Sequence, residues 1–149
     1  FLPQGKVVVS EEKKDGIGKI YRSKGYDIFD EKLRLVILLD GGSASAAEIL
    51  AGALSQQGVA TLVGTKTFGK GSIQELVPIT PDSALKVTIA HWITPNGTNL
   101  SAGGLGPDIK VDYTKEDAEN ERDPQLDKAI EILRKGEFPP QMIENNDTL

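Results

Sequence analysis

The segment Leu33–Leu39 restricts the fold of this chain more than any other, because it is almost continuously apolar. Such a run is expected of a strand that is buried on both faces of a sheet. It leads through Asp40-Gly41-Gly42 into a segment with helical periodicity, and a second short apolar segment, Val59–Val63, follows that helix. Strand, helix and strand in this order predict a βαβ unit, in which the two strands run parallel. The sequence therefore predicts an α/β fold.

The predicted helix between these strands has one apolar face and a defined end. Apolar residues recur at positions i, i+3, i+4, i+7 and i+8, which is the spacing of one helix face; they are Ala46, Ile49, Leu50, Ala53 and Leu54. The helix is predicted to end at Gln56-Gln57-Gly58, with Gly58 at the position after the cap, where glycine is favoured.

Further elements surround this unit. Two short strands at the N-terminus form a polar hairpin, two longer strands follow the βαβ unit, and a helix lies near the C-terminus; the segments are Lys6–Ser10, Lys19–Arg22, Ser72–Ile79, Ala84–Ile93 and Asp123–Leu133. The last begins with Asp123 as N-cap and Pro124 at the first helical position. We expect residues 1–134 to belong to one folded domain and residues 135–149 to be a disordered acidic tail.

Composition excludes several classes of function. The 149 residues contain no cysteine, so thiol catalysis, disulfides and cysteine-ligated metals are excluded. The net charge is −5, and the segment from Asp112 onward holds eleven acids against five bases. The sequence shows no basic stripe of the kind that a nucleic-acid-binding protein usually has. No apolar run approaches the roughly 18–20 residues that span a bilayer. Because the chain opens with Phe1 and without a signal segment, we expect it to be a piece of a longer protein.

Two segments carry residues suited to catalysis. Gly41–Ile49 places a small hydroxyl on a Gly-rich turn, and Phe68–Gln74 places Lys70 between two glycines. A serine hydroxyl becomes a good nucleophile when a base takes its proton, and a desolvated lysine can be that base. Taken alone, however, Ser45-Ala46-Ala47-Glu48 also fits a capping box, in which the serine only caps the helix.

Both segments resemble the carboxy-terminal processing proteases, also called tail-specific proteases, which are Ser-Lys endopeptidases. The family pattern Gly-Ser-Ala-Ser-Ala-Ser-Glu-Ile departs from this chain only at Ala47, and Phe-Gly-Lys-Gly-x-x-Gln matches Phe68–Gln74. Four more stretches are similar to the family in the same order, so that the resemblance covers roughly residues 1–133; they are Phe1–Val8, Trp92–Gly97, Gly104–Ile109 and Asp123–Ala129.

The resemblance implies roles for individual residues. Ser45 is the nucleophile, Lys70 is the general base, and Gln74 orients Lys70. Ser43 is then a turn or cap residue. The backbone N–H of Ala46 is one oxyanion donor, and an Asn-Pro-Gly-Gly turn upstream of this region supplies the second.

The proposed base must be neutral near pH 7. Burial has to depress the pKa of Lys70 from its usual value of about 10.4. Gln74 can accept a hydrogen bond from the lysine without adding charge, whereas a carboxylate there would raise the lysine pKa.

Wider properties of the protein are also implied by the resemblance. The fold is expected to be crotonase-like, with an antiparallel hairpin and a C-terminal helix beside the βαβ core. The substrates are proteins or peptides cleaved near their C-termini, an upstream PDZ domain belongs to the same protein, no cofactor is needed, and the location is the cell envelope or periplasm. Without the upstream parts, we expect the fragment itself to be inactive.

Other interpretations of these residues are less favoured. Gly64, Gly69 and Lys70 partly match a phosphate-binding loop, but Gly71 stands where Ser or Thr is needed and a strand follows instead of a helix. His91 is the only histidine and lies on an apolar strand face, so a Ser-His-Asp triad and a zinc site are disfavoured. Trp92 and Thr94–Gly97 are expected to be packing and turn residues.

Two other classes of function stay open at this level. A fold does not fix function, so the chain could be a noncatalytic binding module on the same fold. It could also be an interaction domain of a larger assembly, for which the acidic end is weak support. The presence of both Ser45 and Lys70 favours the enzyme.

Overall fold

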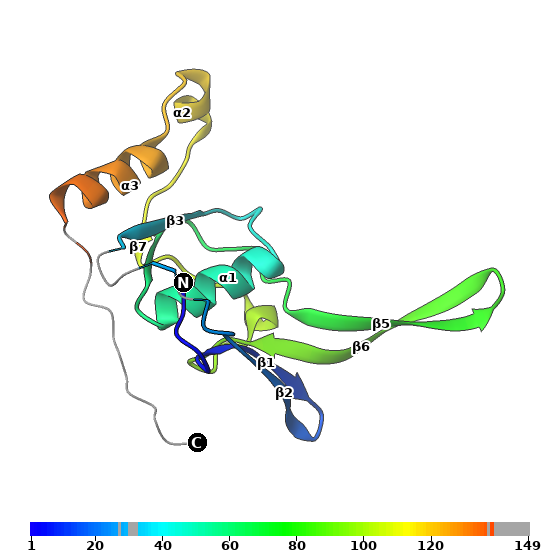
Figure 1. The fold of residues 1–149 in the computed structure, drawn as a ribbon. Coiled ribbons are helices and arrows are strands. Elements are labelled where there is room, and N and C mark those ends of the chain that lie inside the picture. The colour runs from blue at the N-terminus through cyan, green and yellow to red at the C-terminus, as the bar shows by residue number, and fades with distance from the viewer. Residues whose placement is uncertain (27, 30–32, 137, 139–149) are drawn as a thin grey trace.

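Two β-sheets with a helix between them form the body of the molecule, in a computed structural model that describes residues 1–26, 28–29, 33–136 and 138 (Figure 1). One sheet is antiparallel with strand order β2-β1-β6-β5, formed by β1 (Val7–Lys13), β2 (Gly16–Arg22), β5 (Ser72–Thr80) and β6 (Ser83–Ile93). The other is parallel with order β3-β4-β7, formed by β3 (Leu35–Leu39), β4 (Ala60–Gly64) and β7 (Ile109–Lys110).

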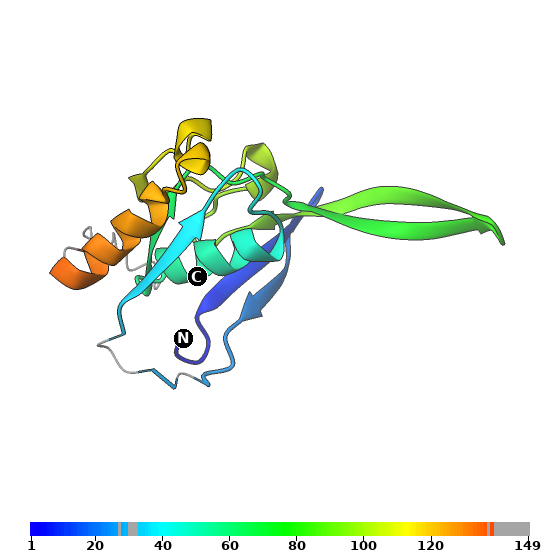
Figure 2. The same ribbon diagram turned by 90° about the horizontal axis from the view of Figure 1, so that it is seen from above.

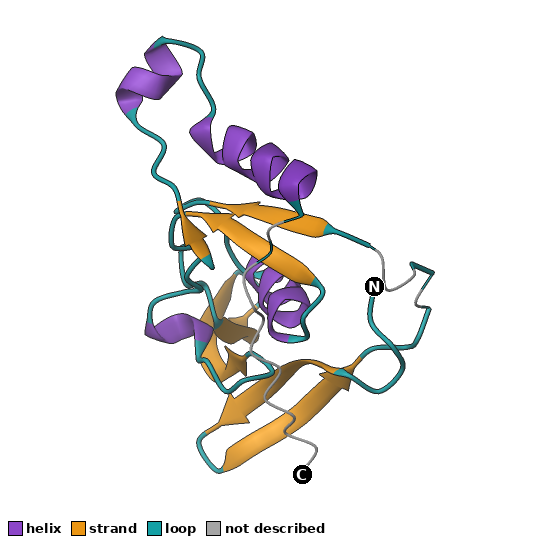
Figure 3. Ribbon diagram, turned by 90° about the vertical axis from the view of Figure 1, so that its left-hand side faces the viewer, coloured by secondary structure: helices purple, strands orange, loops and turns teal. Residues whose placement is uncertain are grey.

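The helices cover the sheets in layers. Helix α1 (Ala46–Gln56) lies between the sheets and contacts both β1 and β4, while α3 (Pro124–Lys135) lies on the opposite face of the parallel sheet (Figure 3). The short helix α2 (Lys115–Glu119) precedes α3, and a 3₁₀ turn, η1 (Leu100–Ala102), packs near β6. No helix in the described ranges is long and apolar enough to cross a membrane.

The predicted βαβ unit is confirmed. Strands β3 and β4 pair in parallel from Leu35↔Ala60 to Leu39↔Gly64, with α1 between them in the sequence. The prediction that the first strand is buried on both faces is wrong in part, because β3 is the edge of the three-stranded sheet and Leu38 is 39% exposed. The fully buried strand is β4, which lies in the centre of that sheet.

The buried face of α1 differs from the predicted one. The buried residues are Glu48, Ala51, Gly52, Ala53 and Leu54, whereas Ala46 and Leu50 are exposed. Because the helix lies between two layers, its small residues face close neighbours: a Cβ added at Gly52 would lie 3.1 Å from Cγ2 of Thr94. Ala51 joins the main core cluster, with Leu39, Leu62, Leu100 and Leu105.

Strands β5 and β6 form a long two-stranded arm that extends from the body (Figure 1 and Figure 2). The predicted pair of strands is confirmed, with antiparallel pairing from Ser72↔His91 to Thr80↔Ser83. Only the end of the arm next to the body is covered, and large apolar side chains such as Leu76, Ile79 and Leu85 are more than half exposed. Of the proposed site residues, only Gln74 lies on the arm, near the body end of β5, and it is exposed.

The C-terminal helix begins as predicted, since a side-chain oxygen of Asp123 accepts a hydrogen bond from the N–H of Leu126 at 2.9 Å and Pro124 follows it. It ends at Lys135, with Gly136 in the left-handed conformation. Hydrogen bonds from Lys128 and Lys135 lower the pKa of Glu131 to about 2. The elements α2 and β7 were not predicted, and most of the expected tail, namely residues 137 and 139–149, lies outside the described residues.

Candidate active site

A tight turn joins β3 to α1 and carries the proposed nucleophile. Oδ1 of Asp40 accepts hydrogen bonds from the N–H groups of Gly42 and Ser43, both at 2.9 Å, and from the Ser43 hydroxyl at 3.1 Å. Ser43 is therefore a turn residue, as predicted. The turn delivers Ser45 to the N-terminal end of α1.

Ser45 has a backbone conformation that is rare for a residue with a side chain. Its φ is 57° and its ψ is −116°, and a positive φ in a non-glycine residue costs of order 1–3 kcal/mol and is typical of functional sites. The Ser45–Glu48 pair has the capping-box arrangement, with the Ser45 N–H donating to Oε2 of Glu48 at 2.8 Å, but no side-chain cap hydrogen bond is made by Ser45. Ser45 is partly buried at the start of the helix.

The N–H of Ala46 is also available at this helix end. It has no hydrogen-bond partner in the part of the chain that the structure describes, as is usual for the first N–H groups of a helix. An unpaired N–H next to a serine hydroxyl is the arrangement that an oxyanion donor needs.

The proposed base lies on the loop between β4 and β5, and glycines let this loop pack closely. Gly69 has a φ of 88°, and a Cβ added there would lie 2.8 Å from the N of Gly104. A Cβ at Gly71 would lie 2.5 Å from the N of Ser101. The glycines on both sides of Lys70 therefore let this loop approach the backbone of Ser101 and Gly104 closely. A strand, β5, follows the loop, which is not the setting of a phosphate-binding helix.

The carboxylate of Glu48 brings the serine turn and the lysine loop together. Its Oε2 accepts from the N–H of Ser45 at 2.8 Å and from the N–H of Lys70 at 2.9 Å. Its Oε1 accepts from the N–H of Gly69 at 2.8 Å and from the hydroxyl of Thr67. The backbones of Ser45 and Lys70 are therefore two hydrogen bonds apart, although 25 positions separate them in the sequence. A further bond, from the N–H of Phe68 to the carbonyl of Ser43 at 2.9 Å, joins the same two loops.

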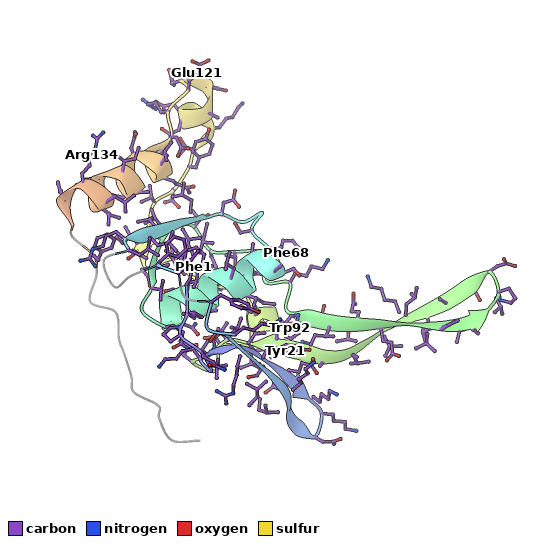
Figure 4. All side chains as sticks on the ribbon, in the orientation of Figure 1. Phe1, Tyr21, Phe68, Trp92, Glu121 and Arg134 are labelled. Carbon is purple, nitrogen blue, oxygen red and sulfur yellow. The ribbon has the colours of Figure 1, made fainter. Side chains whose placement is uncertain are left out.

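The hydrogen bonds that join the two loops involve the backbones of Ser45 and Lys70 and not the side chains of the proposed residues. Lys70 is exposed, which differs from the predicted burial. Gln74 is also exposed, and its Nε2 lies 3.5 Å from Oγ1 of Thr88 across the arm. In the described ranges, Ser45, Lys70 and Gln74 make no side-chain hydrogen bond with one another. The exposed ring of Phe68 lies beside the N-terminal end of α1 (Figure 4).

Sequence reasoning missed the importance of Glu48, which it considered only as part of a capping box. The structure gives this carboxylate no exposed surface and four hydrogen-bond donors. One signal was available: Glu48 is the only charged residue in the small and apolar segment Ala46–Leu54. Charged residues are almost never fully buried unless they are paired, so an acid in such a helix indicates converging donors.

The residues set aside on sequence grounds have structural partners. His91 Nδ1 lies 2.8 Å from Oγ of Ser101. Trp92 packs against the main core cluster and meets the ring of Tyr21 edge-on at 5.7 Å (Figure 4). Thr94 and Gly97 form a turn through an N–H to carbonyl bond of 2.9 Å. No cluster of three or more His, Cys, Asp or Glu suited to a metal occurs among the residues whose structure is described.

Comparison with known proteins identifies relatives for most of the chain. It is 42% identical over 112 residues to the carboxy-terminal-processing protease of Bartonella bacilliformis, covering 75% of this chain and 26% of that protein. It is 49% identical over 76 residues to carboxyl-terminal-processing peptidase 3, chloroplastic, of Arabidopsis thaliana, covering 51% of this chain and 15% of that protein. The chain thus spans about a quarter or less of the length of these relatives.

The fold and a family match agree with these relatives. The solved structure of the photosystem II D1 C-terminal processing protease superposes with a TM-score of 0.69 at 38% identity, covering 75% of this chain and 28% of that one. Residues 1–111 match peptidase family S41, and they include β3, α1 and the segments Gly41–Ile49 and Phe68–Gln74. The chain belongs to peptidase family S41.

Proposed function

We propose that the protein containing this chain is a serine endopeptidase that cleaves protein substrates near their C-termini through an acyl-enzyme. The observation that carries this proposal is the carboxylate of Glu48, which accepts hydrogen bonds from the backbones of both Ser45 and Lys70. Membership of the S41 family and the positive φ of Ser45 support it.

In the proposed mechanism, Lys70 and Ser45 act as base and nucleophile. Oγ of Ser45 attacks the carbonyl carbon of the scissile peptide while its proton passes to the neutral amine of Lys70. The N–H of Ala46 donates to the oxygen that becomes negative. Lys70 returns the proton to the leaving amine, and an ester remains on Ser45. Water, deprotonated by Lys70, then hydrolyses the ester and frees Ser45.

The exposed position of Lys70 bears on this mechanism. Lysine is neutral near pH 7 only where desolvation lowers its pKa, and the described residues leave the side chain exposed. We propose that other parts of the protein, with the PDZ domain implied by the resemblance among them, or the bound substrate, cover Lys70 in the working enzyme. On the same basis we expect the 149-residue chain alone to be inactive.

Fold type and location follow as parts of the same proposal. We assign the core to the crotonase-like type on the basis of its βαβ unit and its S41 relatives. We also propose a location in the cell envelope, outside the cytoplasm. Fractionation of cells that produce the full-length protein would test this, and recovery in the cytoplasm would contradict it.

The function is tested by labelling the full-length protein with a serine-reactive fluorophosphonate. We expect the label on Ser45, because only an activated hydroxyl reacts rapidly with this probe. Peptide mapping locates the label, and Ser45→Ala is the matched control. A folded wild type that is neither labelled nor able to cleave an unfolded protein would instead favour a binding module on the same fold.

The charge at position 74 should control the pH dependence of the reaction. Glu at this position, four residues after Lys70 at the start of β5, would stabilise the ammonium form of Lys70, so the pKa of Lys70 would rise. We therefore expect Gln74→Glu to lower kcat/KM at neutral pH and to recover in part as the pH rises. Gln74→Ala should lose orientation without such recovery. The measurement is kcat/KM against pH, and equal profiles for the two variants would contradict the role of Gln74.

A further inference from the structure

Thr67 and Glu48 form a buried polar network that joins three segments of the chain. Both residues are buried, with exposed fractions of 6% and 0%. The hydroxyl of Thr67 donates to Oε1 of Glu48 and accepts from the N–H of Leu105 at 2.7 Å. The network therefore connects α1, the loop that carries Lys70, and the loop that follows η1.

Only a group with two acceptor oxygens can satisfy the donors that face Glu48. Four donors converge on it, two at each oxygen, and three of them are backbone N–H groups that cannot reverse their role. A carboxylate accepts at both oxygens, whereas the amide of glutamine would turn an NH₂ group towards two donors. The backbone spacing of Ser45 and Lys70 thus depends on the carboxylate itself.

Thr67 fixes the direction in which this carboxylate points. The Glu48 side chain has several rotatable bonds, and the Thr67 hydroxyl donates to Oε1 while the N–H of Ser45 donates to Oε2. The main chain of Thr67 is fixed as well, since its N–H donates to the carbonyl of Leu105 at 3.0 Å. Gly104 permits this contact, because a Cβ there would lie 2.6 Å from the carbonyl oxygen of Thr67.

We propose that Thr67 is a positioning residue, which acts through the carboxylate of Glu48 to set the Lys70 loop at the correct distance from Ser45. This inference rests on the proposed Ser-Lys function. The hydrogen bonds of Thr67 given above go to Glu48 and Leu105, and not to Ser45 or Lys70. Its effect is on the geometry of proton transfer, where a misplacement of about 1 Å can cost about 10²-fold in rate.

The experiment compares Thr67→Val with Thr67→Ser in the full-length protein. Valine keeps the shape of threonine and removes the hydroxyl, while serine keeps the hydroxyl and removes the methyl group. We expect Thr67→Val to lower kcat by about 10²-fold with little change in KM, and Thr67→Ser to retain most of the wild-type kcat. Melting temperatures are measured in parallel, so that kcat is compared only between folded proteins.

The possible results separate the inference from the function on which it rests. A folded Thr67→Val enzyme with wild-type kcat, or a lower melting temperature with unchanged kcat, would overturn the positioning role. If Thr67→Val does not fold, Glu48→Gln is measured in its place. We expect its kcat to fall while its KM stays constant, and an unchanged kcat in the folded variant would overturn the inference. If the wild type does not cleave, or if Ser45→Ala still does, the proposed function is wrong instead.

Discussion

Replacement of Ser45 or Lys70 by alanine should abolish turnover in the full-length protein. In the proposed mechanism neither residue can act alone, because the Ser45 hydroxyl needs a base to take its proton and Lys70 acts by taking that proton. For a nucleophile and base that act as a unit, loss of either costs about 10⁶-fold in kcat, and loss of both costs no more. The measurement is kcat for Ser45→Ala, Lys70→Ala and the double variant.

Two further variants make this prediction specific. Ser43→Ala removes a hydroxyl two residues from the nucleophile, but that hydroxyl bonds only within the turn, to Asp40. It should cost about 1–2 kcal/mol of stability and leave the chemistry largely intact. Lys70→Arg should be inactive at any workable pH, since guanidinium does not deprotonate in proteins. An active Lys70→Arg enzyme would show that the base lies elsewhere, and an inactive Ser43→Ala with active Ser45→Ala would move the nucleophile by two residues.

Gly64→Ala should be the most damaging single methyl addition for the fold. Gly64 has a φ of 132°, and an added Cβ would lie 2.0 Å from the carbonyl oxygen of Leu39 on the neighbouring strand. Backbone strain and overpacking each cost about 1–3 kcal/mol, and at this distance β3 and β4 must separate. We expect a loss of at least about 3 kcal/mol, or a fall in melting temperature of roughly 6–12 °C in a domain of this size.

A matched glycine provides the control. Gly106 has no positive φ and no atom within 4 Å of an added Cβ, so Gly106→Ala should leave the melting temperature nearly unchanged. Thermal unfolding followed by circular dichroism measures both variants. Equal melting temperatures for Gly64→Ala and Gly106→Ala would show that β3 and β4 can move apart at little cost at this point.

Local signals in the sequence predicted the framework of the fold. The βαβ unit was predicted from the apolar run before Asp40, the glycine-terminated helix and the second apolar strand. The start of α3 was predicted from Asp123-Pro124. These elements were predictable because their residues act on neighbours a few positions away. The S41 family was also predicted, from motifs that lie in two short segments.

Features that depend on distant contacts were not predictable in the same way. The four donors of Glu48 come from positions up to 22 residues away, so nothing local shows that its charge is satisfied. The predicted apolar face of α1 was wrong at Leu50, which is exposed, whereas Ala51 and Gly52 are buried. The burial of Lys70 was expected from its proposed chemical role, but the side chain is exposed in the described residues. Strand β7 has only two residues and exists because β4 offers it an edge.

The carboxylate of Glu48, which joins the Ser45 turn to the Lys70 loop, also affects local unfolding of the native state. Local unfolding proceeds in cooperative units, and segments that share hydrogen bonds open together. The N–H groups of Ser45, Gly69 and Lys70 all donate to one buried side chain, so release of one loop leaves an unpaired charge for the other. These three amide protons should therefore exchange with solvent at similar rates, and the proposed nucleophile and base should be ordered or lost as one unit.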